Sequence, residues 1–172
     1  MRGASVGKIR EVEGGVTAPC GYEAAGVRCG LKQQGPDFAL VYSCDPAVAA
    51  GVFTTNLVKA APVLLTRTRL KSGLAQAILV NAGNANACTG PEGLEDAAAC
   101  TKEAAGLLQI PERLVLPAST GVIGQPLPLE KIKLALPKLT ARLHPKGFPE
   151  AAEAIMTTDT RPKTALLREK ID

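Results

Sequence analysis

The stretch AQAILVNAGNANA, residues 75–87, decides the fold class. Its first part is largely apolar and predicts a strand at Ala75–Val80. A loop is expected at Asn81–Ala87, because Asn and Gly tolerate left-handed backbone. Small and apolar residues recur at helical spacing over Leu94–Leu108, behind an acidic first turn, which predicts a helix. A strand, a polar loop and a helix in this order indicate a mixed α/β domain.

The same signals predict further elements on both sides of this unit. Alternation and β-branched residues indicate strands at Phe38–Ser43, Ala50–Phe53, Pro62–Leu65, Arg113–Leu116 and Thr164–Leu167. Helices are expected at Leu129–Leu136, ending near Pro137, and at Pro149–Met156. No internal repeat or low-complexity linker divides the chain, so a single domain over residues 1–172 is predicted, either α+β or layered α/β.

Composition excludes several classes of protein. Twenty Lys and Arg against sixteen Asp and Glu give a net charge of +4, and these charges are spread rather than gathered into a basic stripe. With no Trp, three Phe and two Tyr, stacking on bases is not expected either, so nucleic acid is not an expected partner. No apolar run approaches the roughly 20 residues of a membrane span, and the first 15 residues lack the apolar stretch of a secretory signal. A soluble, cytoplasmic protein is expected.

Cysteine and histidine usage argues against a metal site. The five cysteines show neither regular spacing nor a CxxC pair; they are Cys20, Cys29, Cys44, Cys88 and Cys100. The single histidine, His144, stands in a proline-containing turn. Zinc needs four closely spaced donors, so reduced structural thiols are the favoured interpretation. A Cys–His nucleophilic pair stays open as a minor alternative.

Three polar segments are candidates for chemistry. The asparagines of Asn81–Ala87 are either turn residues or convergent amide donors at a strand end. Ser119-Thr120-Gly121 sets a hydroxyl beside an open backbone N–H, which could stabilise an oxyanion on an acyl carbonyl or simply form a turn. The threonines and Asp159 of residues 156–160 either cap the next element or contact a polar substrate. Neither of the common glycine-rich phosphate-binding patterns is present.

Taken together and in this order, these segments resemble the ornithine acetyltransferase family of arginine biosynthesis. The residues that carry the resemblance are GGVTAP at 14–19, AAGV at 24–27, VFTTN at 52–56, VNAGNANACTG at 80–90, STGVIG at 119–124 and AIMTTDT at 154–160. The resemblance runs from about residue 8 to the end of the chain, and several of its strings are long and uncommon.

The resemblance implies an enzyme made from one precursor that cuts itself before a threonine. Its fold is a layered α-β-β-α sandwich, similar to the self-cleaving N-terminal-nucleophile enzymes, in which a β chain completes the core of the α chain. The two chains pair into an αβαβ heterotetramer. The enzyme moves an acetyl group from N2-acetylornithine to glutamate by a ping-pong route through an acetyl-threonine. It needs no cofactor or metal, and acetyl-CoA is a possible second acetyl donor.

The resemblance also assigns roles to individual residues. Thr120 and Gly121 match the family's oxyanion hole, and Thr157, with Thr158 a close second, matches its substrate-contacting threonine. The family's Lys-Gly-x-Gly-Met segment and the nucleophilic threonine after it are absent from this sequence. The chain is therefore expected to be most of an α chain and inactive alone. Two alternatives stay open: an aminopeptidase or amidohydrolase of the same fold group, and a non-catalytic subunit.

Overall fold

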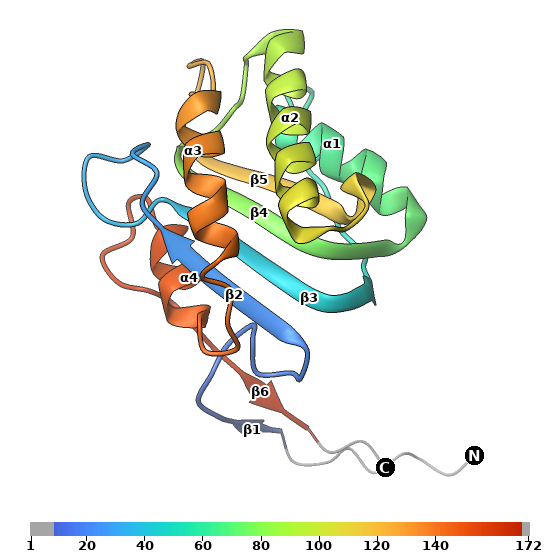
Figure 1. Cartoon of the computed structure of the whole chain (residues 1–172), viewed down its shortest axis with the longest axis vertical. Helices are drawn as coiled ribbons and strands as arrows, with labels where there is room; N and C mark the ends of the chain where they lie inside the picture. The colour runs from blue at the N-terminus through green and yellow to red at the C-terminus, as the bar shows by residue number, and fades with distance from the viewer. Residues whose placement is uncertain (1–8, 170–172) are drawn as a thin grey trace.

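A four-stranded sheet forms the centre of the fold, in the order β2-β3-β4-β5 (Figure 1). The computed structural model describes residues 9–169, so the two ends of the domain expected over 1–172 lie outside the described residues. The strands are β2 (Tyr22–Val27), β3 (Phe38–Val48), β4 (Leu74–Asn84) and β5 (Val115–Val122). The first three pair antiparallel, whereas β4 and β5 are parallel and are joined through a helix, as parallel neighbours require.

One face of the sheet packs against α2 (Gly90–Leu108) and α3 (Leu129–Thr140). The larger side chains of this core are Phe38, Leu40, Leu79, Leu127, Ile132, Leu136 and Leu139. The surface that α2 turns to the core is built from Cys100, Ala104 and Ala105, so the helix lies close to the sheet. A core of small aliphatic side chains explains how the domain forms without tryptophan.

The opposite face is covered only in part. Helix α4 (Phe148–Ala154) packs on β2 and β3, where a Cβ on Gly26 would lie 2.2 Å from the Glu150 carbonyl oxygen. Towards β4 this face stays open, with Val41 and Val80 half-buried and Ile78 41% exposed. A sheet layered between helices confirms the expected mixed α/β fold class.

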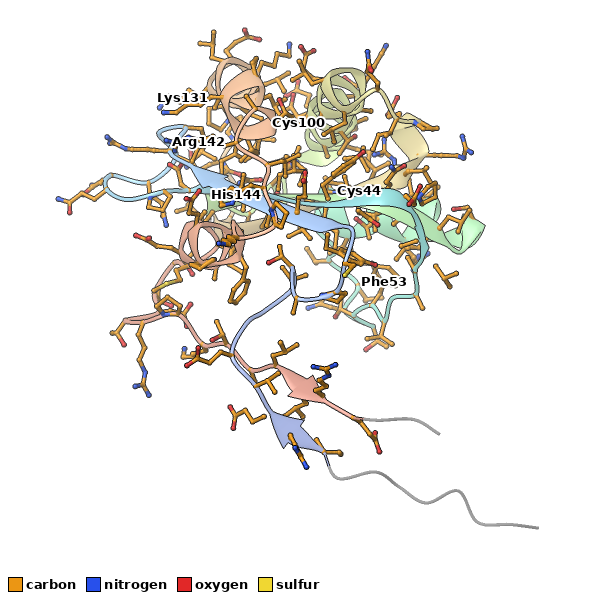
Figure 2. The ribbon with its side chains drawn as sticks, turned by 60° about the horizontal axis from the view of Figure 1, so that its bottom comes forward. Cys44, Phe53, Cys100, Lys131, Arg142 and His144 are labelled. Atoms are coloured by element: carbon orange, nitrogen blue, oxygen red, sulfur yellow. The ribbon has the colours of Figure 1, made fainter. Side chains whose placement is uncertain are left out.

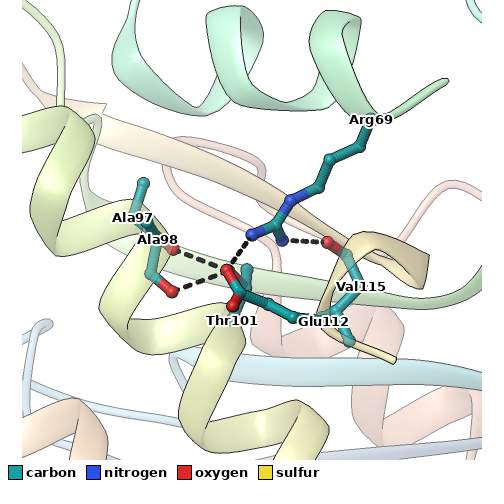
Figure 3. A network of polar contacts seen from close by, with 6 residues as sticks. All are labelled: Arg69, Ala97, Ala98, Thr101, Glu112 and Val115. Carbon is teal, nitrogen blue, oxygen red and sulfur yellow. Dashed lines mark hydrogen bonds and ion pairs between the residues drawn. The ribbon is translucent and has the colours of Figure 1, made fainter. Parts of the chain in front are cut away.

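Helix α1 (Ala61–Arg69) protects the free edge of β5. The Thr66 hydroxyl donates to the Pro117 carbonyl over 2.8 Å, and the Arg69 guanidinium donates to the Val115 carbonyl over 2.5 Å. Figure 3 shows Arg69 held between that carbonyl and Glu112, a residue of the short helix η2 (Glu112–Leu114). These side chains thus donate to edge carbonyls that could otherwise accept hydrogen bonds from the strand of another molecule.

Two of the predicted strands are wrong. Pro62–Leu65 lies in the first turns of α1, where a proline is tolerated because the early N–H groups have no partner within the helix. A short apolar run does not by itself distinguish a strand from a buried helix. Ala50–Phe53 forms no strand, since the β3–β4 ladder ends where Val48 pairs with Leu74.

Other elements were placed correctly with shifted ends. The strand expected at Arg113–Leu116 starts at Val115, and only Leu167 of Thr164–Leu167 is paired, in a two-residue strand β6 (Leu167–Arg168) against β1 (Arg10–Glu11). Helix α3 passes through Pro137 rather than ending there. Strand β2 was missed, and the short helix η1 (Leu70–Ser72) follows α1. No helix within residues 9–169 is long and apolar enough to cross a membrane.

Candidate active site

The parallel pairing of β4 and β5 brings two of the predicted motifs together. Asn81 lies opposite Ser119, Ala82 opposite Thr120, and Gly83 opposite Gly121. Segments almost forty residues apart in the sequence therefore share one edge of the sheet, because the carboxyl ends of parallel strands meet on the same side.

The three asparagines hold this edge rather than face a ligand. Asn81 accepts a hydrogen bond from the Ser119 hydroxyl (2.6 Å) and donates to the Asn84 carbonyl (2.7 Å). Asn84 donates to the Gln125 and Pro126 carbonyls, and Asn86 donates to Gly93. All three side chains are buried. The loop expected at Asn81–Ala87 is wrong over its first part, because Asn81–Asn84 belong to β4 itself rather than to a turn.

Thr120 and Gly121 are more exposed than the three buried asparagines. Side chains alternate along β5, so Thr120 points to the opposite face from Ser119 and is partly exposed. Within residues 9–169, the Thr120 hydroxyl makes no hydrogen bond. Gly121 is exposed and has a φ of 133°, and a Cβ there would lie 2.3 Å from the carbonyl carbon of Gly83. The position thus requires glycine, next to a hydroxyl that makes no hydrogen bond within the described residues.

Thr157 and Thr158 lie in an exposed bend directly after α4. No helix or strand begins between them and Leu167, so neither threonine caps a following element in the described part of the chain. Asp159 pairs with Lys163, and this contact holds the pKa of the Asp159 carboxyl below its usual range. Both threonines are exposed to solvent, and their contact with a substrate stays a prediction.

The Thr120–Gly121 pair and the Thr157–Thr158 pair do not line a common cavity among the described residues. A cavity of about 500 Å³ lies over the open sheet face and reaches Met156 and Asp159, but Thr120, Gly121, Thr157 and Thr158 are not in its lining. It is floored by Val41 and Val80. The link between the pairs runs through the β2–β3 loop, residues 28–37, in which Lys32 donates from Nζ to the Met156 carbonyl over 2.9 Å. This loop was not among the predicted site elements.

The histidine and the cysteines do not gather into a metal-binding cluster in the described part of the chain. Within residues 9–169 no group of three or more His, Cys, Asp or Glu side chains could hold a metal ion. His144 is bridged to Ala24 of β2, and its Nε2 lies 3.9 Å from a Glu150 carboxylate oxygen. In Figure 2, Cys44 and Cys100 lie apart from it. A Cys–His pair is not among the contacts of the described residues.

The half-buried Cys29 thiol and the buried Cys100 thiol are expected to resist alkylation in the native protein. Burial raises the pKa of Cys29 to about 12, assisted by the negative charge of Asp37, and burial raises the pKa of Cys100 to about 12 as well. Because the thiolate is the nucleophile, iodoacetamide at pH 8 should leave both unmodified. Peptide mass mapping before and after unfolding in urea checks this result, and rapid labelling of native Cys100 would contradict it.

Comparison with known proteins identifies the protein family of this chain. The model of the ArgJ family matches residues 23–172, which include every candidate site residue. The chain belongs to the ArgJ family. It is 53% identical over 161 residues to the arginine biosynthesis bifunctional protein ArgJ of Symbiobacterium thermophilum, which covers 92% of this chain and 40% of that protein. The ArgJ of Thermosynechococcus vestitus is 54% identical over 160 residues, with 92% and 38% covered.

Solved ArgJ structures share the fold. The ornithine acetyltransferase of Mycobacterium tuberculosis, crystallised with ornithine, is 39% identical and superposes with a TM-score of 0.87, covering 95% of this chain and 94% of that one. The ArgJ of Bacillus halodurans is 34% identical with a TM-score of 0.86, covering 95% and 93%. The chain spans about 40% of the length of the ArgJ sequences it matches.

Proposed function

We propose that this ArgJ chain is part of an acetyltransferase that moves the acetyl group of N2-acetylornithine to glutamate. The observation that carries the proposal is the partly exposed Thr120 beside the exposed Gly121 near the end of β5, in a chain of this family. The ornithine bound to the Mycobacterium tuberculosis relative supports the substrate class. Family membership favours acetyl transfer over the hydrolase and the non-catalytic alternatives.

The chemistry follows from what this pair can donate. The proposed nucleophile is a threonine hydroxyl outside these 172 residues, whose oxygen attacks the acetyl carbonyl carbon. The carbonyl oxygen then carries a negative charge, to which the Thr120 hydroxyl and the Gly121 N–H donate. The C–N bond breaks, the leaving amine takes a proton, and ornithine departs while the acetyl group stays on the threonine as an ester. The amine of glutamate attacks this ester through a second oxyanion on the same donors. The C–O bond of the ester then breaks, the threonine oxygen takes the proton that the amine loses, and N-acetylglutamate departs.

Thr157 is proposed to contact the amino acid substrate, with Thr158 as the second candidate. Both are exposed, and both follow a helix end that the β2–β3 loop holds in place. A hydroxyl can accept from an α-ammonium group or donate to an α-carboxylate. The substrates are zwitterions, so further charged contacts are expected from the rest of the enzyme.

The partner of this chain is proposed to be the β chain of the same precursor, in an αβαβ assembly. Support comes from the sheet face that α4 leaves open, where Ile78 is 41% exposed and Val41 and Val80 floor a cavity. A second sheet laid on this face would complete the α-β-β-α sandwich. The enzyme is further proposed to be cytoplasmic and to work without a cofactor, with acetyl-CoA as a possible second acetyl donor.

The test is expression of the complete reading frame that contains this chain. Intact-mass measurement and N-terminal sequencing should find a second chain that begins with threonine. With N2-acetylornithine and glutamate, the purified particle should form N-acetylglutamate, and initial rates should give the parallel double-reciprocal lines of a ping-pong enzyme. Release of acetate at the same rate without glutamate would instead support a hydrolase. A particle without a threonine-initiated chain and without transfer would overturn the proposal.

A further inference from the structure

A buried carboxylate organises the β2–β3 loop. Asp37 is completely buried, and its two oxygens accept four successive backbone N–H groups at 2.6–3.0 Å, those of Cys29, Gly30, Leu31 and Lys32. Burial by itself works to raise the pKa of this carboxyl, but the backbone donors outweigh burial and the net pKa is lowered. The loop therefore closes around an ionised anchor and presents the Lys32 side chain in a fixed direction.

One side of the loop lies against the oxyanion-hole strands. A Cβ on Gly83 of β4 would lie 2.9 Å from the Leu31 carbonyl oxygen and 3.2 Å from Cγ of Lys32. Gly83 is the residue that lies opposite Gly121 in the β4–β5 ladder. The stem of Lys32 is thus separated from the candidate oxyanion hole by a single glycine backbone.

The other end of the same side chain reaches the candidate substrate segment. Its ammonium donates to the Met156 carbonyl, across 124 positions of sequence, and Thr157 is the next residue. Residues 157–160 belong to no helix or strand, so no backbone ladder places them. Figure 1 shows the β2–β3 loop and the segment after α4 on the same side of the molecule. A hydrogen bond from a charged donor is roughly twice as strong as a neutral one, which suits it to this task.

We propose that Lys32 is a positioning residue that holds Thr157 at a set distance from Thr120 and Gly121. It contacts both elements of the site, the stem beside Gly83 and the ammonium on Met156, and no other side-chain hydrogen bond of the described residues joins the β2–β3 loop to residues 156–160. The inference rests on the proposed function, because it assigns Lys32 to the binding of the acetylated amino acid at that site.

The test replaces Lys32 by methionine in the complete enzyme. Methionine keeps an apolar stem beside Gly83 and removes the ammonium. The KM for N2-acetylornithine should rise about tenfold, the loss expected for one charge-assisted hydrogen bond, while kcat stays close to wild type. Lys32→Arg, which keeps a charged donor, should restore most of the affinity. Lys32→Gln is a second neutral variant and should raise KM in the same way.

Lys131→Met is the matched control. Lys131 on α3 donates from Nζ to the Gly30 carbonyl of the same loop over 3.0 Å, but it does not reach Met156. Its loss removes the same kind of bond from the same loop, and KM should not change. An equal rise of KM in both variants would mean that general loosening of the loop is responsible, and the positioning role would fall.

A double-mutant cycle with Thr157→Val separates positioning from a direct role. If Lys32 acts through Thr157, then Lys32→Met adds little to the KM of Thr157→Val. If the KM of the double variant instead rises by the product of the two single-variant increases, or if Lys32→Met alone has the wild-type KM, the inference is overturned. Failure of the proposed function has a different signature, since Thr120→Ala would then keep wild-type turnover whatever happens at Lys32.

Discussion

Thr120→Ala is expected to lower the turnover of the complete enzyme by about 10²–10³-fold. The hydroxyl of Thr120 lies beside the exposed Gly121 and, within residues 9–169, has no hydrogen bond of its own. It is therefore available to an oxygen that becomes negative only in the transition state. Loss of such a donor lowers kcat and kcat/KM together and leaves KM nearly unchanged.

Two variants control this result. Thr120→Ser keeps the hydroxyl and should retain most of the turnover. Thr68→Ala removes the same atoms from an exposed threonine of α1, whose hydroxyl bonds only to its own helix at Leu64, and should behave as wild type. Wild-type kcat in Thr120→Ala would remove Thr120 from the oxyanion hole. A raised KM with unchanged kcat would reassign it to substrate binding.

The sequence predicts well where local chemistry decides the structure. The unit from β4 to α2 combines an apolar strand, residues that tolerate left-handed backbone, and a periodic helix, and each part is local. Thr120 and Gly121 could be found because a hydroxyl beside glycine is visible in a tripeptide. Their role became specific only through the family resemblance, since most such tripeptides are turns.

The parts that were missed depend on contacts between distant residues. Strand β2 contains Ala24 and Gly26 because α4 packs directly against them, and small residues are not a strand signal. In the sequence, Asp37 looks like an ordinary acidic loop residue before β3. Nothing in the neighbouring sequence indicates that its carboxylate accepts four backbone N–H groups. The bond from Lys32 to Met156 joins positions 124 residues apart, which no spacing pattern reveals.

Asp37→Asn is expected to lower the free energy of unfolding by about 3 kcal/mol at pH 7, from the loss of charge-assisted hydrogen bonds at a buried site. The side chain of asparagine has only one accepting oxygen. Asp37 uses one carboxylate oxygen for the N–H of Cys29 and the other for those of Gly30, Leu31 and Lys32. In either amide orientation, at least one backbone N–H faces an NH₂ group. Urea unfolding of the complete wild-type and variant enzymes at equal concentration measures the difference.

The pH dependence of this difference tests its cause. The pKa of Asp37 is lower in the folded protein than its ordinary value of about 3.9, so its carboxylate stabilises the fold fully above that value. The contribution is lost as the pH falls through the folded-state pKa. The gap between wild type and Asp37→Asn should therefore be constant from pH 6 to 8 and shrink below about pH 4. Asp45→Asn, at an exposed aspartate of β3, is the matched control and should show no such gap.

A gap that persists unchanged in acid would show that shape, and not charge, holds the β2–β3 loop. The same variant also reports on the active site, because the loop that Asp37 closes carries Lys32. If the loop positions Thr157, Asp37→Asn enzyme that is still folded at pH 7 should show the raised KM of Lys32→Met with little change in kcat. A destabilised enzyme with wild-type KM would separate the stability of the loop from substrate binding.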